Sequence, residues 1–158
     1  MLEFYLPNRE FIKNLSLNTG TSAAPVFTKM CTTSEIGIDT DLETQDFYVF
    51  CDAIQRKIVT GASVMLSGTV KLDMNNSAIV QLLGDVHSLI KDGSIAQFNN
   101  QLVQFDLVTG IQDAVLEYTT YQVPVTLSLS DLGGAAEDVS EFSFEMTIVG
   151  KGTVVTSA

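Results

Sequence analysis

Apolar and polar side chains alternate along much of this chain. In residues 62–73 the even positions are apolar and the later odd positions are polar, and this period of two predicts a half-buried strand. The same alternation returns in 102–108, 121–130 and 141–149. In the last of these we expect the following side chains to face the core: Phe142, Phe144, Met146 and Ile148.

One segment has helical periodicity instead. Apolar residues in 77–92 recur three and four positions apart, which predicts an amphipathic helix with one packing face. Asn76 or Ser77 suits the N-cap, and Gly93 suits the left-handed conformation that ends helices. The expected packing face consists of Ile79, Leu82, Leu83, Val86 and Ile90.

The rest of the chain is organised around this strand and helix. Further strands are expected at 25–33 and 94–98, and residues 131–140 are expected to form a loop. Residues 1–24 lack a sustained period, so we interpret them as an N-terminal arm that orders only against a neighbour, or as a frayed end. Residues 25–158 then form a single domain of seven or eight strands with one helix.

Residues 33–43 have an acidic face. As a strand they place Ile36, Ile38 and Leu42 on one side and four carboxylates on the other. That side is either an ordinary solvated face or a functional acidic surface, since no Lys or Arg lies between the acids. The four acids are Glu35, Asp39, Asp41 and Glu43.

Residues 44–60 are apolar on both sides of an extended chain. Such a segment is either a central buried strand or an arm held by another subunit. Because it lies between two alternating strands, it also suits a long projecting hairpin, with its tip at 55–57. Its apolar run is Phe47, Tyr48, Val49 and Phe50.

Composition narrows the class of protein. Apolar residues make up 46% of 158 and charged residues only 17%, so some apolar surface is expected to face a partner. A net charge of −11 argues against holding nucleic acid by charge. Cys31 and Cys51 are expected to be buried free thiols. No segment has the form of a signal peptide or membrane span, which favours synthesis in the cytoplasm.

Motifs for catalysis or cofactor binding are weak. His87 is the only histidine, and we expect it to be a core or interface residue rather than a catalytic one. No other residues with metal-ligand spacing accompany it in the sequence. Gly133 and Gly134 lack the downstream Lys of a phosphate loop. Paired carboxylates could serve a glycosidase, but without Trp an aromatic cleft is hard to build. We therefore expect no enzyme activity, no metal and no cofactor.

The order of elements resembles the tail tube (major tail) proteins of long-tailed bacteriophages, and is similar to the tube proteins of contractile injection machines. The resemblance covers most of the chain beyond Ala24. The stretches that carry it are TSEIGIDTDLE (33–43), SVMLSGTVKLD (63–73) with its helix, YQVPVTLSLSDLGG (121–134) and EFSFEMTIVGKG (141–152).

The resemblance implies a β-sandwich or partly closed β-barrel with a flanking helix. Such subunits form hexameric rings that stack into a hollow tube, so the implied partners are other copies, together with tape measure, terminator and distal tail proteins. The resemblance also implies that DNA would pass through without specific binding, and that the chain would reside in the virion after assembly in the host cytoplasm. Glu35, Asp39, Asp41 and Glu43 would line the lumen. The implied subunit interface is Phe47, Tyr48, Val49 and Phe50, with Phe4 and Tyr5 of the arm.

Two other functions remain open from the sequence. The chain could be another ring-forming tail component, such as a terminator or distal tail subunit, which would form rings that do not stack. It could also be a small-molecule or sugar-binding β-domain whose apolar surplus lines a pocket. Such a domain would stay monomeric at all concentrations, whereas a tube protein would not.

Overall fold

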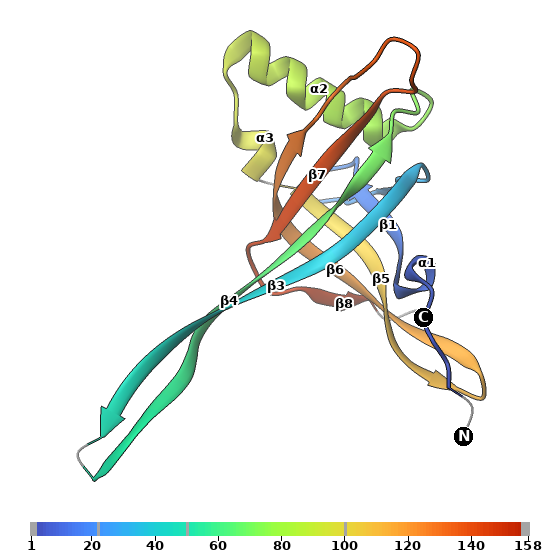
Figure 1. The fold of residues 1–158 in the computed structure, drawn as a ribbon. Coiled ribbons are helices and arrows are strands. Elements are labelled where there is room, and N and C mark those ends of the chain that lie inside the picture. The colour runs from blue at the N-terminus through green and yellow to red at the C-terminus, as the bar shows by residue number, and fades with distance from the viewer. Residues whose placement is uncertain (1–2, 22, 50, 100, 156–158) are drawn as a thin grey trace.

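The computed structural model describes residues 3–21, 23–49, 51–99 and 101–155. Within them, three helices and eight strands follow one another along the chain (Figure 1). In order they are α1 (Asn8–Phe11), β1 (Ile12–Asn18), β2 (Phe27–Lys29), β3 (Thr33–Val49), β4 (Asp52–Lys71), α2 (Ser77–Asp92), α3 (Ala96–Asn99), β5 (Gln101–Gln112), β6 (Val115–Ser130), β7 (Glu141–Ile148) and β8 (Thr153–Val155).

The strands form one antiparallel sheet in the order β2-β1-β5-β6-β7-β4-β3, and β8 pairs with β6 beyond the end of β7. The predicted mainly-β class, with a flanking helix and a long hairpin, is confirmed. The sheet is open, with β2 and β3 at its two edges, and no second sheet is stacked on it in the described part of the chain.

One face of this sheet carries the core. Leu66 on β4 lies opposite Met146 on β7, which lies opposite Leu127 on β6. These side chains belong to the same buried cluster as Leu17 of β1, although β1 and β4 are four places apart in the sheet. The sheet must therefore curve around its apolar face, which removes that surface from water.

Helix α2 begins and ends at the predicted residues. The Asn76 side chain accepts a hydrogen bond from the Ala78 amide, and Gly93, at φ 67°, donates its amide to Leu89. Ile79 and Leu82 are buried, and Leu83 and Val86 are half-buried.

Ile90 does not pack as predicted, because it is 78% exposed. It lies eleven residues after Ile79 and so points to the same side of the helix. The period is therefore right, but the last turn of α2 extends beyond the core that its first two turns cover.

The N-terminal arm predicted over 1–24 is wrong for its second half. Ile12–Asn18 is strand β1 and pairs with β5, and its Leu15 and Leu17 are buried in the core. The register shifts between Lys13 and Ser16, and Asn14 has φ 57°. This β-bulge interrupts the period of two, which explains why the sequence pattern concealed the strand.

Four smaller expectations also differ from the structure. The segment expected as a strand at 94–98 instead leads into helix α3. The expected hairpin tip at 55–57 lies within β4, and the turn falls between Val49 and Asp52. Cys31 and Cys51 are free but exposed, since they lie in turns at strand ends. The short strand β8 was not predicted.

Candidate assembly surfaces

The structure brings the four predicted acids onto one surface. Glu35, Asp39, Asp41 and Glu43 are all exposed and lie on β3, with their side chains on the face opposite the core because Ile36 and Ile38 pack inward. Their partners across β4 are small or uncharged: Thr69, Met65, Ser63 and Gly61. No base on β4 therefore faces these acids directly.

This polar face continues over the next two strands. Glu145 of β7 lies between Ser67 of β4 and Ser128 of β6, and serines and threonines surround it. Lys71 is at one end of the face and pairs with Glu141 at 3.5 Å. Glu145 therefore extends the acidic surface beyond β3.

Further along the sheet the polar face reaches β5. Gln122 donates its amide to Gln104 at 2.9 Å, and Asp106 accepts a hydrogen bond from Thr120. The five strands β3, β4, β7, β6 and β5 thus present a polar, net acidic surface opposite the apolar core. We call it the outer face.

The hairpin of β3 and β4 projects from the body (Figure 1). Strand β7 pairs with β4 only at residues 65–71, so the rest of the hairpin is a two-stranded ribbon. A register shift between Glu43 and Thr44 leaves Thr60 as an extra residue on β4. Beyond this bulge, β4 side chains switch faces, and Lys57 pairs with Asp46 at 3.9 Å.

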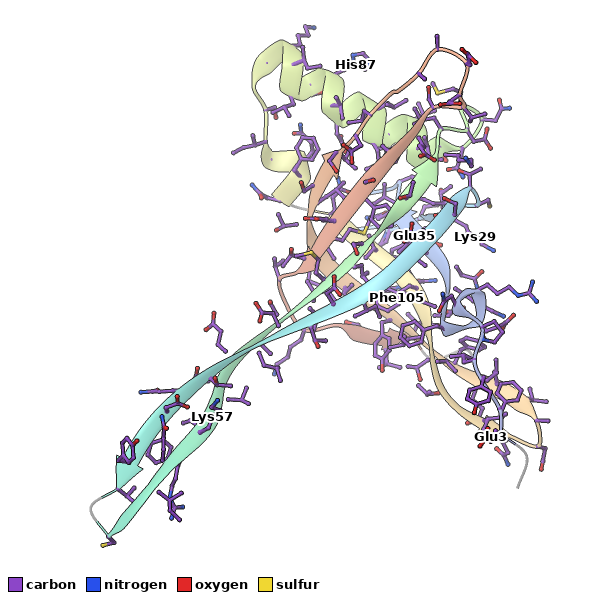
Figure 2. All side chains as sticks on the ribbon, in the orientation of Figure 1. Glu3, Lys29, Glu35, Lys57, His87 and Phe105 are labelled. Carbon is purple, nitrogen blue, oxygen red and sulfur yellow. The ribbon has the colours of Figure 1, made fainter. Side chains whose placement is uncertain are left out.

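Apolar side chains project from both faces of this ribbon (Figure 2). Tyr48 is 68% exposed and Val49 is exposed, whereas Phe47 is half-buried opposite Arg56. Phe50 lies outside the described residues. Three further exposed apolar residues, which were not predicted, join them on β4: Ile54, Ile58 and Val59. Their position opposite the aromatic run is the signal that could have found them.

The N-terminal segment has exposed aromatic rings as well. Phe4 is 57% exposed and Tyr5 is 81% exposed. Beyond them the chain is fixed by α1, where the Tyr118 hydroxyl donates to both the carbonyl and the carboxylate of Glu10, at 2.8 and 2.9 Å. The Lys13 ammonium lies 2.7 Å from that carboxylate and 4.9 Å from the centre of the Tyr118 ring. Hydrogen bonds from Lys13, and then from Tyr118, lower the pKa of the Glu10 carboxyl.

Within the described residues, the remaining titratable groups form no catalytic arrangement. His87 is exposed on α2, so it does not occupy the core. Burial raises the pKa of Asp85, which accepts a hydrogen bond from the Gln101 amide at 3.2 Å. Among the described residues, no three His, Cys, Asp or Glu side chains gather where a metal ion could bind. No described helix is long and apolar enough to cross a membrane.

Comparison with known proteins rests on structure alone. No protein-family model matches the sequence. No curated protein matches it either. A chain from the virion of the native gene transfer agent particle superposes with a TM-score of 0.54 at 15% identity, covering 90% of this chain and 96% of that one.

Two further structures give the same result. A chain from the sheath–tube complex of the extracellular contractile injection system PVC, in its extended state, has a TM-score of 0.53 at 13% identity, covering 98% and 95%. A chain from the tail of the empty gene transfer agent particle, described with C6 symmetry, has a TM-score of 0.50 at 14% identity, covering 90% and 96%. The chain therefore has the fold found in these virion, tail and tube assemblies, as the resemblance predicted.

Proposed function

We propose that this chain is the structural subunit of a tail tube, which forms hexameric rings that stack into a conduit for DNA. One observation carries the proposal. A single curved sheet buries its apolar face and turns an acid-bearing face outward, while a hairpin with exposed apolar side chains projects from its edge. This combination suits a wall built from many copies.

The outer face, which is turned away from the core of the subunit, is the proposed wall of the lumen at the centre of the tube. Glu35, Asp39, Asp41 and Glu43 form a row along β3, and ring symmetry would repeat that row around the channel. Negative charge concentrated in a narrow passage repels the phosphate backbone, so DNA moves without adhering. The serines and threonines beside the acids keep the surface hydrated and leave few apolar contacts for bases.

The hairpin is the proposed contact between copies. An isolated two-stranded ribbon is marginally stable in water, and this one exposes Tyr48, Ile54 and Val59. The free edge of β3 also needs cover, because unpaired strand edges promote uncontrolled pairing. A closed ring supplies both partners to every copy. The C6 symmetry of one structural neighbour supports six copies in each ring.

The proposed tube also implies contacts with other tail proteins and a location in the virion. A tube of this kind ends on other tail proteins, so we propose tape measure, terminator and distal tail proteins as contacts. The site of action is the virion, after assembly in the host cytoplasm. The proposed role is structural, with no reaction and no cofactor.

Electron microscopy of the purified protein over a range of concentrations tests the proposal. Stacked tubes are the expected result. Single rings that never stack would indicate a terminator or distal tail subunit, and monomers at every concentration would refute a tube role.

The lumen assignment has a separate test. Changing Asp39→Lys together with Asp41→Lys should leave tubes intact but slow or block DNA delivery, because the reversed charge attracts phosphate. The matched control reverses two acids of the exposed loop after β6, Asp131→Lys and Glu137→Lys. Equal infectivity of the two double variants would contradict the lumen role.

The hairpin contact is tested by Tyr48→Asp with Ile54→Asp. Both side chains are exposed in the single chain, so its fold and melting temperature should change little while assembly is lost. Val115→Asp is the control, since this valine is 66% exposed at the β5–β6 turn. Normal tubes from the double variant would rule out this interface.

A further inference from the structure

A groove separates the two parts of the sheet that curve toward each other. It is bounded by Ile12–Leu15 of β1 and by Thr33–Ile38 of β3, with α1 at one end, and has a volume of about 580 Å³. Strand β3 has β4 as its sole partner, and β1 meets β2 only at Ser16–Asn18 in the described residues. Two strand edges therefore face the groove without being joined to each other.

The shape and lining of the groove suit an extended peptide. The six residues of the β3 edge span roughly 20 Å at ~3.4 Å each. Ile36 and Ile38 supply apolar surface toward the core side, and a Cβ built on Gly37 would meet no atom within 4 Å. An added strand could thus place apolar side chains toward the core and a bulky one over Gly37.

The groove is also the basic part of an acidic protein. Arg9, Lys13 and Lys29 line it, with Glu35 as the one acid among its lining residues. Glu10 pairs with Lys13 at 2.7 Å and with Arg9 at 4.0 Å, so the groove keeps only a small positive excess, to which Lys29 contributes. Lys29 and Glu35 lie near the start of β3 in Figure 2. Because the chain has a net charge of −11, an occupant carrying a carboxylate is attracted to this position over the rest of the surface.

Glu3–Pro7 has the properties of this occupant. It is extended at Pro7, with φ −64° and ψ 147°, and its residues pair with no strand that the structure describes. Phe4 and Leu6 lie on one side of an extended chain, and Glu3 and Tyr5 on the other. Five residues span about 17 Å, close to the length of the β3 edge.

Glu3–Pro7 does not lie in the groove of its own chain. Asn8 and Arg9 line one end of the groove, but the chain that precedes α1 runs away from this end toward the N-terminus (Figure 1). We propose that Glu3–Pro7 of a second copy occupies the groove as an added strand on β3, which exchanges strands between neighbouring subunits. This inference rests on the assembly proposed above.

Cysteine cross-linking tests the exchange directly. Cys31 is exposed and lines the groove, so Tyr5→Cys in a Cys51→Ser background places the second thiol on the proposed strand. After mild oxidation of assembled protein, the expected result is a ladder of covalent multimers on a non-reducing gel. Disulfides form only when the two Cα atoms come within about 7 Å, so the bond reports contact.

The control is Val115→Cys in the same background, at the exposed β5–β6 turn. We expect at least fivefold more covalent multimer from Tyr5→Cys than from this control. Equal yields would overturn the groove assignment, and a disulfide within one chain would overturn exchange between copies. Should Tyr5→Cys prevent assembly, Glu3→Cys gives the same measurement. Microscopy of the unmodified protein reports on tube formation independently, so the two proposals fail separately.

Discussion

Gly68 allows β3, which carries the acidic residues, to pack closely against β4. It lies on β4 with Ile36 of β3 on one side and Phe144 of β7 on the other. A Cβ at this position would overlap the carbonyl oxygen of Glu35, and it would come within 2.9 Å of the Phe144 ring. A register shift between Thr33 and Glu35 lies directly beside this contact. Gly68→Ala should therefore push β3 away from β4.

The size of the effect follows from which atoms must move. Extra methyl groups in packed cores cost about 1–3 kcal/mol, and the upper part of this range applies where main chain must shift. Removing a glycine from a strand returns roughly 0.5–1 kcal/mol. We expect a net loss of about 2 kcal/mol in the free energy of unfolding. For a chain of this length that corresponds to a melting temperature lower by about 4–8 °C.

Two other glycines are matched controls for thermal or urea unfolding of the single chain. Gly37→Ala, on β3, meets no atom within 4 Å, so it should stabilise by about 0.5–1 kcal/mol because only the strand-glycine effect remains. Gly84→Ala lies within α2 and meets none either, so it should stabilise by about 0.5–1 kcal/mol. The reasoning is refuted if Gly68→Ala unfolds at the same temperature as Gly37→Ala.

Two further predictions concern ionisable groups. Burial raises the pKa of Asp85, so ionisation of this carboxyl costs stability as pH rises through that pKa. Asp85→Asn should therefore raise the melting temperature at pH 7 by about 1–3 °C. The gain should vanish below the ordinary Asp pKa of about 3.9, where the carboxyl is neutral in both the folded and the unfolded chain. An unchanged difference across that range would contradict this assignment. The lowered pKa of Glu10 means that its contacts stabilise α1 above its ordinary pKa of about 4.3 and are lost on acidification below it. Tyr118→Phe removes the hydroxyl hydrogen that the carbonyl and carboxylate of Glu10 share, so amide hydrogen exchange in residues 3–11 should accelerate several-fold at pH 7, and equal exchange in both proteins would contradict the anchor.

Sequence periodicity was sufficient wherever a strand or helix is regular and has one buried face. Alternation identified β7 and the β4 segment beside it, and the 3.6-residue period with its Asn76 and Gly93 caps identified α2. The same rule placed Glu35, Asp39 and Asp41 on one face, since side chains alternate along any regular strand. These features depend on local geometry, which neighbouring residues determine.

Features that depend on distant segments needed the tertiary structure. The bulge at Asn14 concealed β1, and the bulge at Thr60 moved Ile58 to a face that simple alternation would not assign. Ile90 has the right helical phase but no core beneath it. The groove between β1 and β3 exists only because the sheet curves and stays open. Periodicity reports which side of an element is apolar, whereas curvature and register decide whether another part of the chain is there to cover it.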